Sequence, residues 1–486
     1  MEKVAGKRET AYCRAEEIWP FKRPRSGAGV REAVLFFEKY GLQRNGVNDR
    51  MQIGKASIKF EEPPVIESMA SIVGKKEGEG PLGKLFDVVE QDDMFGADTW
   101  EQAESALQKQ TADLAIEKGD IRKKDIRYLF AGDLLGQLIA TSFGTVDLEI
   151  PLFGLYGACS TMGEALNLGA MTVAAGYADK IIAMASSHFA TAEKQFRFPL
   201  AYGNQRPFSA TWTVTGCGAV VVSKHKSEGI AAITGITTGR MVDMGSKDSM
   251  NMGAAMAPAA FHTIEQNFED FGVDESYYDK IITGDLGEIG RTILLDFMKN
   301  KDHLLEEIHT DCGIEIYDQE TQDTHAGGSG CGCSAATLCS YILPKIKDGT
   351  WKRVLFVPTG ALLSTVSFNE GQPIPGIAHA VMLEHIGYDW CCLRQKGDND
   401  GICKSISCRR CNLRPGSDTD GQHKADAGPD HGAAGGERNN SWRSGPLSAV
   451  CGLGRRRSHS TTAWLRKHAL EGRVEEHGRG RTSGNL

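Results

Sequence analysis

Four short segments of the chain occur twice in the same order, and this internal duplication constrains the fold more than any single motif. The matched pairs are 128–135 with 280–287, 157–160 with 330–336, 181–187 with 354–364, and 218–225 with 378–385. Each copy is typical of a strand, a helix and two further strands. We therefore expect two similar α/β halves related by a pseudo-twofold axis, with a ligand-binding cleft where they meet.

The duplication places the halves at 51–225 and 226–386 and leaves two ends outside them. Residues 1–50 have neither helix caps nor sustained periodicity, so Met51 is a candidate native start. Residues 387–486 are rich in Gly, Arg, Ser and Asp, a composition that predicts disorder. Two explanations stay open: linkers or interaction tails, and the preferred one, read-through or a shifted reading frame.

Composition excludes several classes of protein. With 486 residues, of which 41% are hydrophobic, the chain can bury a large core. A net charge of −8 without a long basic stripe argues against nucleic-acid binding. The first residues lack an apolar leader and no run approaches about 20 apolar residues, so we expect any membrane association to be peripheral.

Cysteine spacing predicts neither a disulfide framework nor a metal site. The 13 cysteines are irregularly spaced, which favours free thiols in a reducing compartment. In the tail, Cys403, Cys408 and Cys411 form a C-x4-C-x2-C run, but a second C-x2-C pair is lacking. We therefore expect no bound metal.

Local patterns support an α/β body. Acidic residues in the first turn predict a helix over 103–114, and a second helix is expected over 256–268 with Pro258 in its first turn. Short apolar runs rich in β-branched residues predict strands at 181–185, 218–222 and 354–357, and residues 125–129 are expected to lead into another buried strand.

Cys159 is the residue with the clearest chemical potential. It follows Gly157 and Ala158 and precedes a run of small residues, a pattern typical of a tight turn from a strand into a helix. At such a helix start the dipole and free N–H groups favour a thiolate. The same geometry also suits a bound carboxylate without any chemistry, and a buried packing role for the cysteine is the third reading.

These residues carry a resemblance to known proteins. The turn at 157–161 and the two duplicated halves resemble the thiolase and ketoacyl-synthase fold, an α/β body of five layers, α/β/α/β/α, with a nucleophilic cysteine at such an elbow. Further segments resemble one branch, the stage V sporulation protein AD family. They are 80–83, 85–87, 131–135, 185–188, 195–197, 213–216, 256–260, 327–331 and 359–364.

The resemblance, which spans about 51–386, implies a sporulation role. A family member is expected to move dipicolinic acid, with calcium, into the forespore and out again on germination. It would work as a soluble partner of membrane proteins from the same sporulation operon, in the cytoplasm or forespore and peripherally at the spore inner membrane. No cofactor is expected, and a homodimer is one arrangement left open.

A dipicolinate site needs particular side chains. The ligand is a flat aromatic dianion, which favours cationic or N–H-rich poles between apolar walls. The residues predicted to bind it are Cys159, Ser160, His188, Lys194, Arg197, Arg206, Asp285 and Ser329.

The sequence also departs from working condensing enzymes. Those proteins use two further polar groups, usually His with His or Asn, around the cysteine. Here residues 283–286 and 326–330 occupy the places of the two motifs that carry these polar groups. An ionised Asp285 cannot donate to an oxyanion. We therefore predict a binding protein. An acyltransferase or condensing enzyme with Cys159 as the catalytic nucleophile, and a structural scaffold for a spore membrane channel, are the alternatives.

Overall fold

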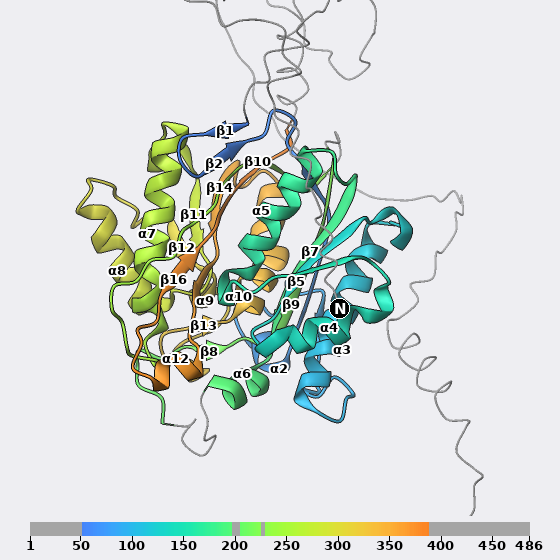
Figure 1. Cartoon of the computed structure of the whole chain (residues 1–486), viewed down its shortest axis with the longest axis horizontal. Helices are drawn as coiled ribbons and strands as arrows, with labels where there is room; N and C mark the ends of the chain where they lie inside the picture. The colour runs from blue at the N-terminus through green and yellow to red at the C-terminus, as the bar shows by residue number, and fades with distance from the viewer. Residues whose placement is uncertain (1–50, 197–204, 225–228, 388–486) are drawn as a thin grey trace, which may run out of the picture. The chain divides into compact units, whose positions relative to one another are not determined.

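The computed structural model describes residues 51–196, 205–224 and 229–387 (Figure 1). The predictions for the two ends of the chain, including the tail cysteines, lie outside these residues, as does the prediction for Arg197.

The duplication appears as two sets of five strands with the same order. The first set runs β3-β9-β7-β5-β6 and the second runs β10-β17-β14-β11-β12. Antiparallel pairing of β3 with β10 joins them. The strands of the first set are β3 (Val65–Val73), β5 (Tyr128–Gly132), β6 (Leu152–Gly154), β7 (Lys180–Ser187) and β9 (Gly216–Ser223). Those of the second are β10 (Ala231–Thr237), β11 (Lys280–Thr283), β12 (His309–Asp311), β14 (Arg353–Val357) and β17 (Ala380–Glu384).

Strand direction and register repeat between the halves. In the first half β5 is parallel to β6 and β7, and β9 is antiparallel to β7; the second half repeats this with β11, β12, β14 and β17. Tyr128 lies opposite Ile181, and their counterparts Lys280 and Val354 also pair. The register therefore reproduces two of the sequence matches.

The fourth sequence match is wrong by one residue. Ile181 pairs with Val222, and Val354 pairs with Leu383, so Val222 corresponds to Leu383. The sequence match had placed Val222 with Met382. Side chains alternate between the faces of a strand, so a shift of one residue changes which face each side chain occupies.

The helices fall into two groups by length, and short strand pairs accompany them. The longer ones are α3 (Trp100–Lys118), α5 (Thr161–Ala174), α7 (Met252–Phe271) and α8 (Gly287–Lys299). Shorter ones are α2 (Lys75–Gly78), α4 (Ile139–Thr145), α6 (Phe189–Phe196), α9 (Cys312–Glu315), α10 (Cys331–Thr337), α11 (Leu343–Lys347) and α12 (Thr365–Asn369). Short strand pairs are β8 (Trp212–Thr213) with β13 (Gly328–Ser329), and β15 (Thr359–Ala361) with β16 (Gly376–Ala378), while β4 (Val88–Val89) pairs with β3.

Side-chain caps explain where the two predicted helices begin. Helix α3 starts at Trp100 because the Thr99 hydroxyl accepts from the backbone N–H of Gln102. Helix α7 starts at Met252 because the Asn251 side chain accepts from the N–H of Ala254. Pro258 therefore lies beyond the first turn, inside the helix, and the prediction that placed it in the first turn was wrong.

Three cores separate five layers, which confirms the predicted fold class. Alternate residues of the first sheet face opposite sides: Phe130 and Ala183 belong to the central core, whereas Leu129 and Ile182 pack with α3. In the second sheet the side facing α7 and α8 has its own core, which includes Leu355. Helices α5 and α10 lie between the two sheets (Figure 1).

One short hairpin crosses the expected boundary between the halves. Strands β1 (Gln52–Ile53) and β2 (Ser57–Lys59) were assigned by sequence to the first half, but β2 pairs with β10, Ile58 opposite Ile236. The chain therefore begins its described part on the sheet of the second half.

No helix in the described part of the chain is long and apolar enough to cross a membrane.

Candidate functional site

Cys159 lies on a strained turn between β6 and α5. Ala158, just before it, has a φ of +50°, a left-handed conformation that costs energy for a residue with a side chain. The Ser160 hydroxyl donates to the carbonyl of Gly157 over 2.7 Å, and the Thr161 hydroxyl donates to that of Ala158 over 2.6 Å. These bonds hold the turn and fix the direction of the Cys159 side chain.

The second half of the chain packs directly on this turn. A Cβ atom on Gly360 would lie 2.4 Å from the carbonyl oxygen of Gly157 and 3.2 Å from the nitrogen of Cys159. Only glycine permits this approach of the two backbones. Cys159 therefore sits where the two halves meet, as the duplication predicted for the cleft.

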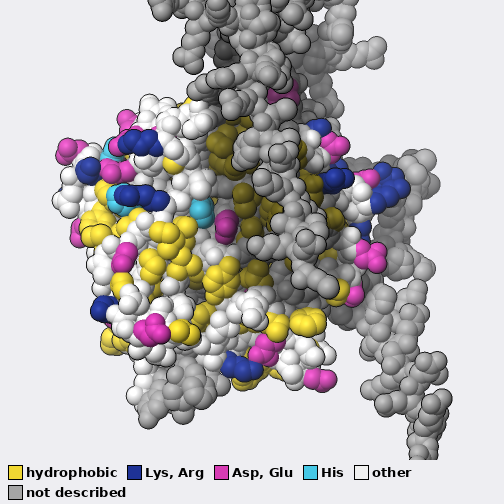
Figure 2. All heavy atoms as spheres, in the orientation of Figure 1, with side chains coloured by type: hydrophobic (Ala, Val, Ile, Leu, Met, Phe, Trp, Pro, Cys, Tyr) yellow, Lys and Arg dark blue, Asp and Glu magenta, His cyan; other side chains and the backbone are white. Residues whose placement is uncertain are grey.

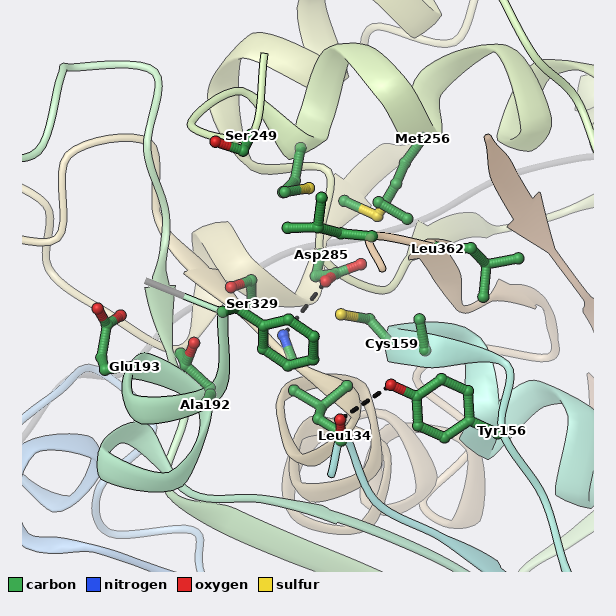
Figure 3. Close-up of a pocket in the computed structure, with 17 residues that line it drawn as sticks. Leu134, Tyr156, Cys159, Ala192, Glu193, Ser249, Met256, Asp285, Ser329 and Leu362 are labelled. Carbon is green, nitrogen blue, oxygen red and sulfur yellow. Dashed lines mark hydrogen bonds between the residues drawn. The ribbon is translucent and has the colours of Figure 1, made fainter. Parts of the chain in front are cut away.

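A pocket opens in front of Cys159 (Figure 3). About 80 Å³ is open to the centres of water molecules, room for several waters or a small organic ligand. Both halves contribute to the lining, which comprises Leu134, Tyr156, Ala158, Cys159, Ala192, Glu193, Phe196, Thr213, Ser249, Met252, Met256, Asp285, Ser329, Gly330, Ala361, Leu362 and Leu363.

Asp285, two residues after β11, is one of two buried carboxyl groups that line this pocket; Glu193 is the other. Asp285 accepts a hydrogen bond from the N–H of Gly330 over 3.2 Å and one from the Thr359 hydroxyl over 2.8 Å. Burial raises its pKa to about 7, although its hydrogen bonds oppose this shift. Near neutral pH the group is therefore present in both protonated and ionised forms.

The Cys159 sulfur points toward the Asp285 carboxyl group (Figure 3). Burial, followed by the charge of Asp285, raises the pKa of this thiol well above its usual value. Burial and the nearby carboxyl group therefore oppose the thiolate that the helix start was expected to favour. Among the described residues that line the pocket, none is a histidine, asparagine, lysine or arginine.

Three predicted ligand-binding residues meet in this pocket: Cys159, Asp285 and Ser329. Ser160 is adjacent, but its hydroxyl is used within the turn. The sequence prediction had already grouped Asp285 and Ser329 with Cys159, although both lie more than 100 positions later in the chain.

Three other predicted residues lie outside the pocket: His188, Lys194 and Arg206. His188 is buried, and its Nε2 lies 2.8 Å from the carbonyl oxygen of Asp93. Burial lowers its pKa, which favours the neutral imidazole. Lys194 pairs with Glu101 at the surface over 2.5 Å.

Arg206 belongs to a separate aromatic cluster. It pairs with Asp323 over 3.3 Å, and its guanidinium lies 4.7 Å from the centre of the Trp212 ring. Lys194 and Arg206, which were expected to supply a cationic pole for the ligand, therefore lie outside the pocket. Arg197 lies outside the described residues.

Sequence reasoning missed most of the apolar walls. Phe196, Met256 and Leu362 lie in or beside segments that carried the family resemblance, so that signal could have identified them. Ser249 carried no signal, since it lies in a polar loop before α7. No group of three or more His, Cys, Asp or Glu side chains that could hold a metal ion occurs among the residues described.

Comparison with known proteins decides the family. A family model described as stage V sporulation protein AD matches residues 54–384. The chain belongs to the stage V sporulation protein AD family. It is also 42% identical over 334 residues to stage V sporulation protein AD of Bacillus subtilis (strain 168), covering 69% of this chain and 98% of that protein. This member of the stage V sporulation protein AD family is therefore a sporulation protein.

Solved structures with similar folds are condensing enzymes and thiolases. One is 3-oxoacyl-[acyl-carrier-protein] synthase III from Aquifex aeolicus VF5, with a TM-score of 0.42 and 14% identity over 66% of this chain and 99% of that chain. Another is Acat5 thiolase from Ascaris suum in complex with coenzyme A, with a TM-score of 0.43 and 11% identity over 67% and 100% of the two chains. The described body of this family member is α/β.

Proposed function

We propose that this sporulation protein binds dipicolinic acid in the Cys159 pocket and supports its uptake, with calcium, into the forespore and its release on germination. The observation that carries the proposal is the position of the Asp285 carboxyl group in the pocket. A buried carboxyl group with a raised pKa lines the pocket together with the thiol and disfavours its ionisation.

The chemistry around Cys159 favours binding over turnover. A thiol with a raised pKa is protonated and is a weak nucleophile. Asp285 raises that pKa further, and no described lining residue is a histidine that could take the proton. Thioester chemistry would thus lack both an activated nucleophile and the usual base.

The shape and polarity of the pocket suit a flat aromatic acid. Leu134, Phe196 and Leu362 supply apolar surface for a ring. The hydroxyl groups of Ser329 and Thr213 can donate to a ligand carboxylate, and protonated Asp285 can do so as well.

Charge in the pocket is consistent with calcium travelling together with the ligand. The ionisable carboxyl groups of Glu193 and Asp285 would repel a free dianion. A one-to-one complex of calcium with dipicolinate is neutral, so the two carboxylates do not repel it. We therefore expect the protein to bind the calcium complex more tightly than free dipicolinate.

Titration calorimetry with dipicolinate, with and without calcium, tests the proposal. Ser249→Trp should fill the pocket from its rim and abolish binding. Met244→Trp is the matched control, because Met244 is 71% exposed in the same loop and does not line the pocket. Equal binding by the two variants would contradict this location of the site.

A second experiment separates the alternatives. Incubation with radiolabelled acyl-CoA should leave no label on Cys159 if the protein is a binder. Acyl label on Cys159 would favour an acyltransferase. Absence of dipicolinate binding in a folded protein that still reaches the spore membrane would favour a scaffold of the channel complex.

The proposal extends to partners and location. Membrane proteins of the same sporulation operon would hold this chain peripherally at the spore inner membrane. Sedimentation with forespore membranes should be lost when those membrane proteins are deleted. Unchanged sedimentation would contradict this part of the proposal.

A further inference from the structure

A second cavity lies beside the middle of α7, away from Cys159. It is bounded by residues 55–56 between β1 and β2, by residues 238–240 after β10, and by three side chains of α7. About 510 Å³ is open to the centres of water molecules. On the face seen in Figure 2, Lys or Arg side chains lie next to His side chains over α7.

The charge of this cavity is opposite to that of the Cys159 pocket. Lys55, Arg240 and His262 line it. None of the described residues that line it is an aspartate or a glutamate, whereas the Cys159 pocket has carboxyl groups and no described cation. Thr238, Thr263 and Gln266 add neutral polar side chains to the lining. The Thr263 hydroxyl donates to the carbonyl of Ala378, and the Gln266 amide donates to Glu269 and Asp270.

Arg240 is the central group. Its guanidinium donates to Nε2 of His262 over 3.4 Å, which requires a neutral imidazole. The pKa of His262 is lowered by burial and then by the positive charge of Arg240. Within the described part of the chain, no carboxylate forms an ion pair with Arg240.

The neighbouring carboxylates are already engaged. Glu269 lies 3.5 Å from the Nζ of Lys55, and Glu265 lies 3.4 Å from the Nζ of Lys301. Asp270 accepts from the backbone N–H groups of Lys55 and Ala56 over 2.9 Å each. The N–H donors of Arg240 that do not reach His262 therefore face a cavity that offers them no internal anion.

We propose that this cavity binds the oxyanion group, phosphate or carboxylate, of a small molecule. A guanidinium presents two parallel N–H donors that match two oxygens of such a group. Lys55, whose Nζ also contacts Glu269, and the hydroxyl of Thr238 lie around the same space and can contact further oxygens. The bound anion would also favour protonation of His262, which would then donate to the ligand.

The site is separate from the proposed dipicolinate pocket, and the inference does not depend on it. Met256 of the pocket and His262 of the cavity are six residues apart on α7, which is about 9 Å along a helix. Variants can therefore alter one site without touching the other.

Calorimetry on the full chain with inorganic phosphate, and separately with calcium-free dipicolinate, tests the proposal and distinguishes the two oxyanions. Arg240→Gln should weaken the binding of whichever anion occupies the cavity at least tenfold. Lys299→Gln removes one exposed positive charge from α8, outside the cavity, and should have no effect. Ser249→Trp, which fills the other pocket, should also leave this binding unchanged.

A second measurement reports on the site directly. The imidazole NMR signals of His262, assigned with His262→Gln, should shift on addition of the bound anion and should not shift in Arg240→Gln. Unaltered thermal midpoints would establish that the variants fold. The proposal fails if neither anion binds, or if Arg240→Gln and Lys299→Gln behave alike.

Discussion

Replacement of Asp285 by asparagine should change how the stability of the protein depends on pH. The folded protein holds the Asp285 proton up to about pH 7, because burial raises the pKa, whereas the ordinary value is 3.8. Between these values the unfolded chain binds fewer protons than the folded protein. The free energy of unfolding therefore falls as pH rises through this window, and the contribution of Asp285 levels off above pH 7.

The size of the effect follows from the pKa. From pH 5 to pH 7, two pH units at about 1.4 kcal/mol each make a loss of about 3 kcal/mol from this one group. Asparagine does not ionise, and its side-chain oxygen can still accept from the N–H of Gly330. Asp285→Asn should therefore lose about 3 kcal/mol less stability between pH 5 and pH 8 than the unchanged protein.

Urea unfolding at pH 5 and at pH 8 measures the free energy of unfolding of both proteins. Glu77, another buried carboxyl group with a raised pKa, contributes equally to the two and cancels in the comparison. Asp120→Asn, at an exposed position, is the matched control and should follow the unchanged protein. Identical pH dependence for Asp285→Asn and the unchanged protein would refute the reasoning.

Three further predictions concern the turn, the central packing and a helix cap. Iodoacetamide should label Cys159 slowly at pH 8, because burial and Asp285 raise the pKa of the thiol; rapid labelling found by mass spectrometry would contradict this. Gly332→Ala should cost more than about 3 kcal/mol in urea unfolding, since its Cβ would lie 2.2 Å from the carbonyl oxygen of Gly216. Gly136→Ala, with no neighbour closer than 3.9 Å, should change stability by less than about 0.5 kcal/mol. Thr99→Ala should cost about 1 kcal/mol by removing the cap of α3, and an unchanged unfolding midpoint would count against that role.

The sequence predicted the duplicated framework because the signals for it are local. The apolar strand at 181–185 and the Gly-Asp-Leu ends at 132–134 and 284–286 recur with their order intact. Strand pairing then follows the same pattern in each half, so Tyr128 and Lys280 occupy equivalent registers. The turn at Cys159 could also be predicted from the sequence, since glycine and small residues mark a tight turn before a helix.

Tertiary structure decided which of the predicted side chains share the site and what their chemistry is. Asp285 and Ser329 reach Cys159 only because the second half packs against the turn through Gly360, while His188 and Lys194 point to other partners. The pairing of β2 with β10 also depends on contacts far apart in the sequence. The protonation state of the Cys159 thiol could not be predicted from the sequence for the same reason. Burial by the folded chain raises the pKa of the thiol, whereas its place before a helix favoured the thiolate.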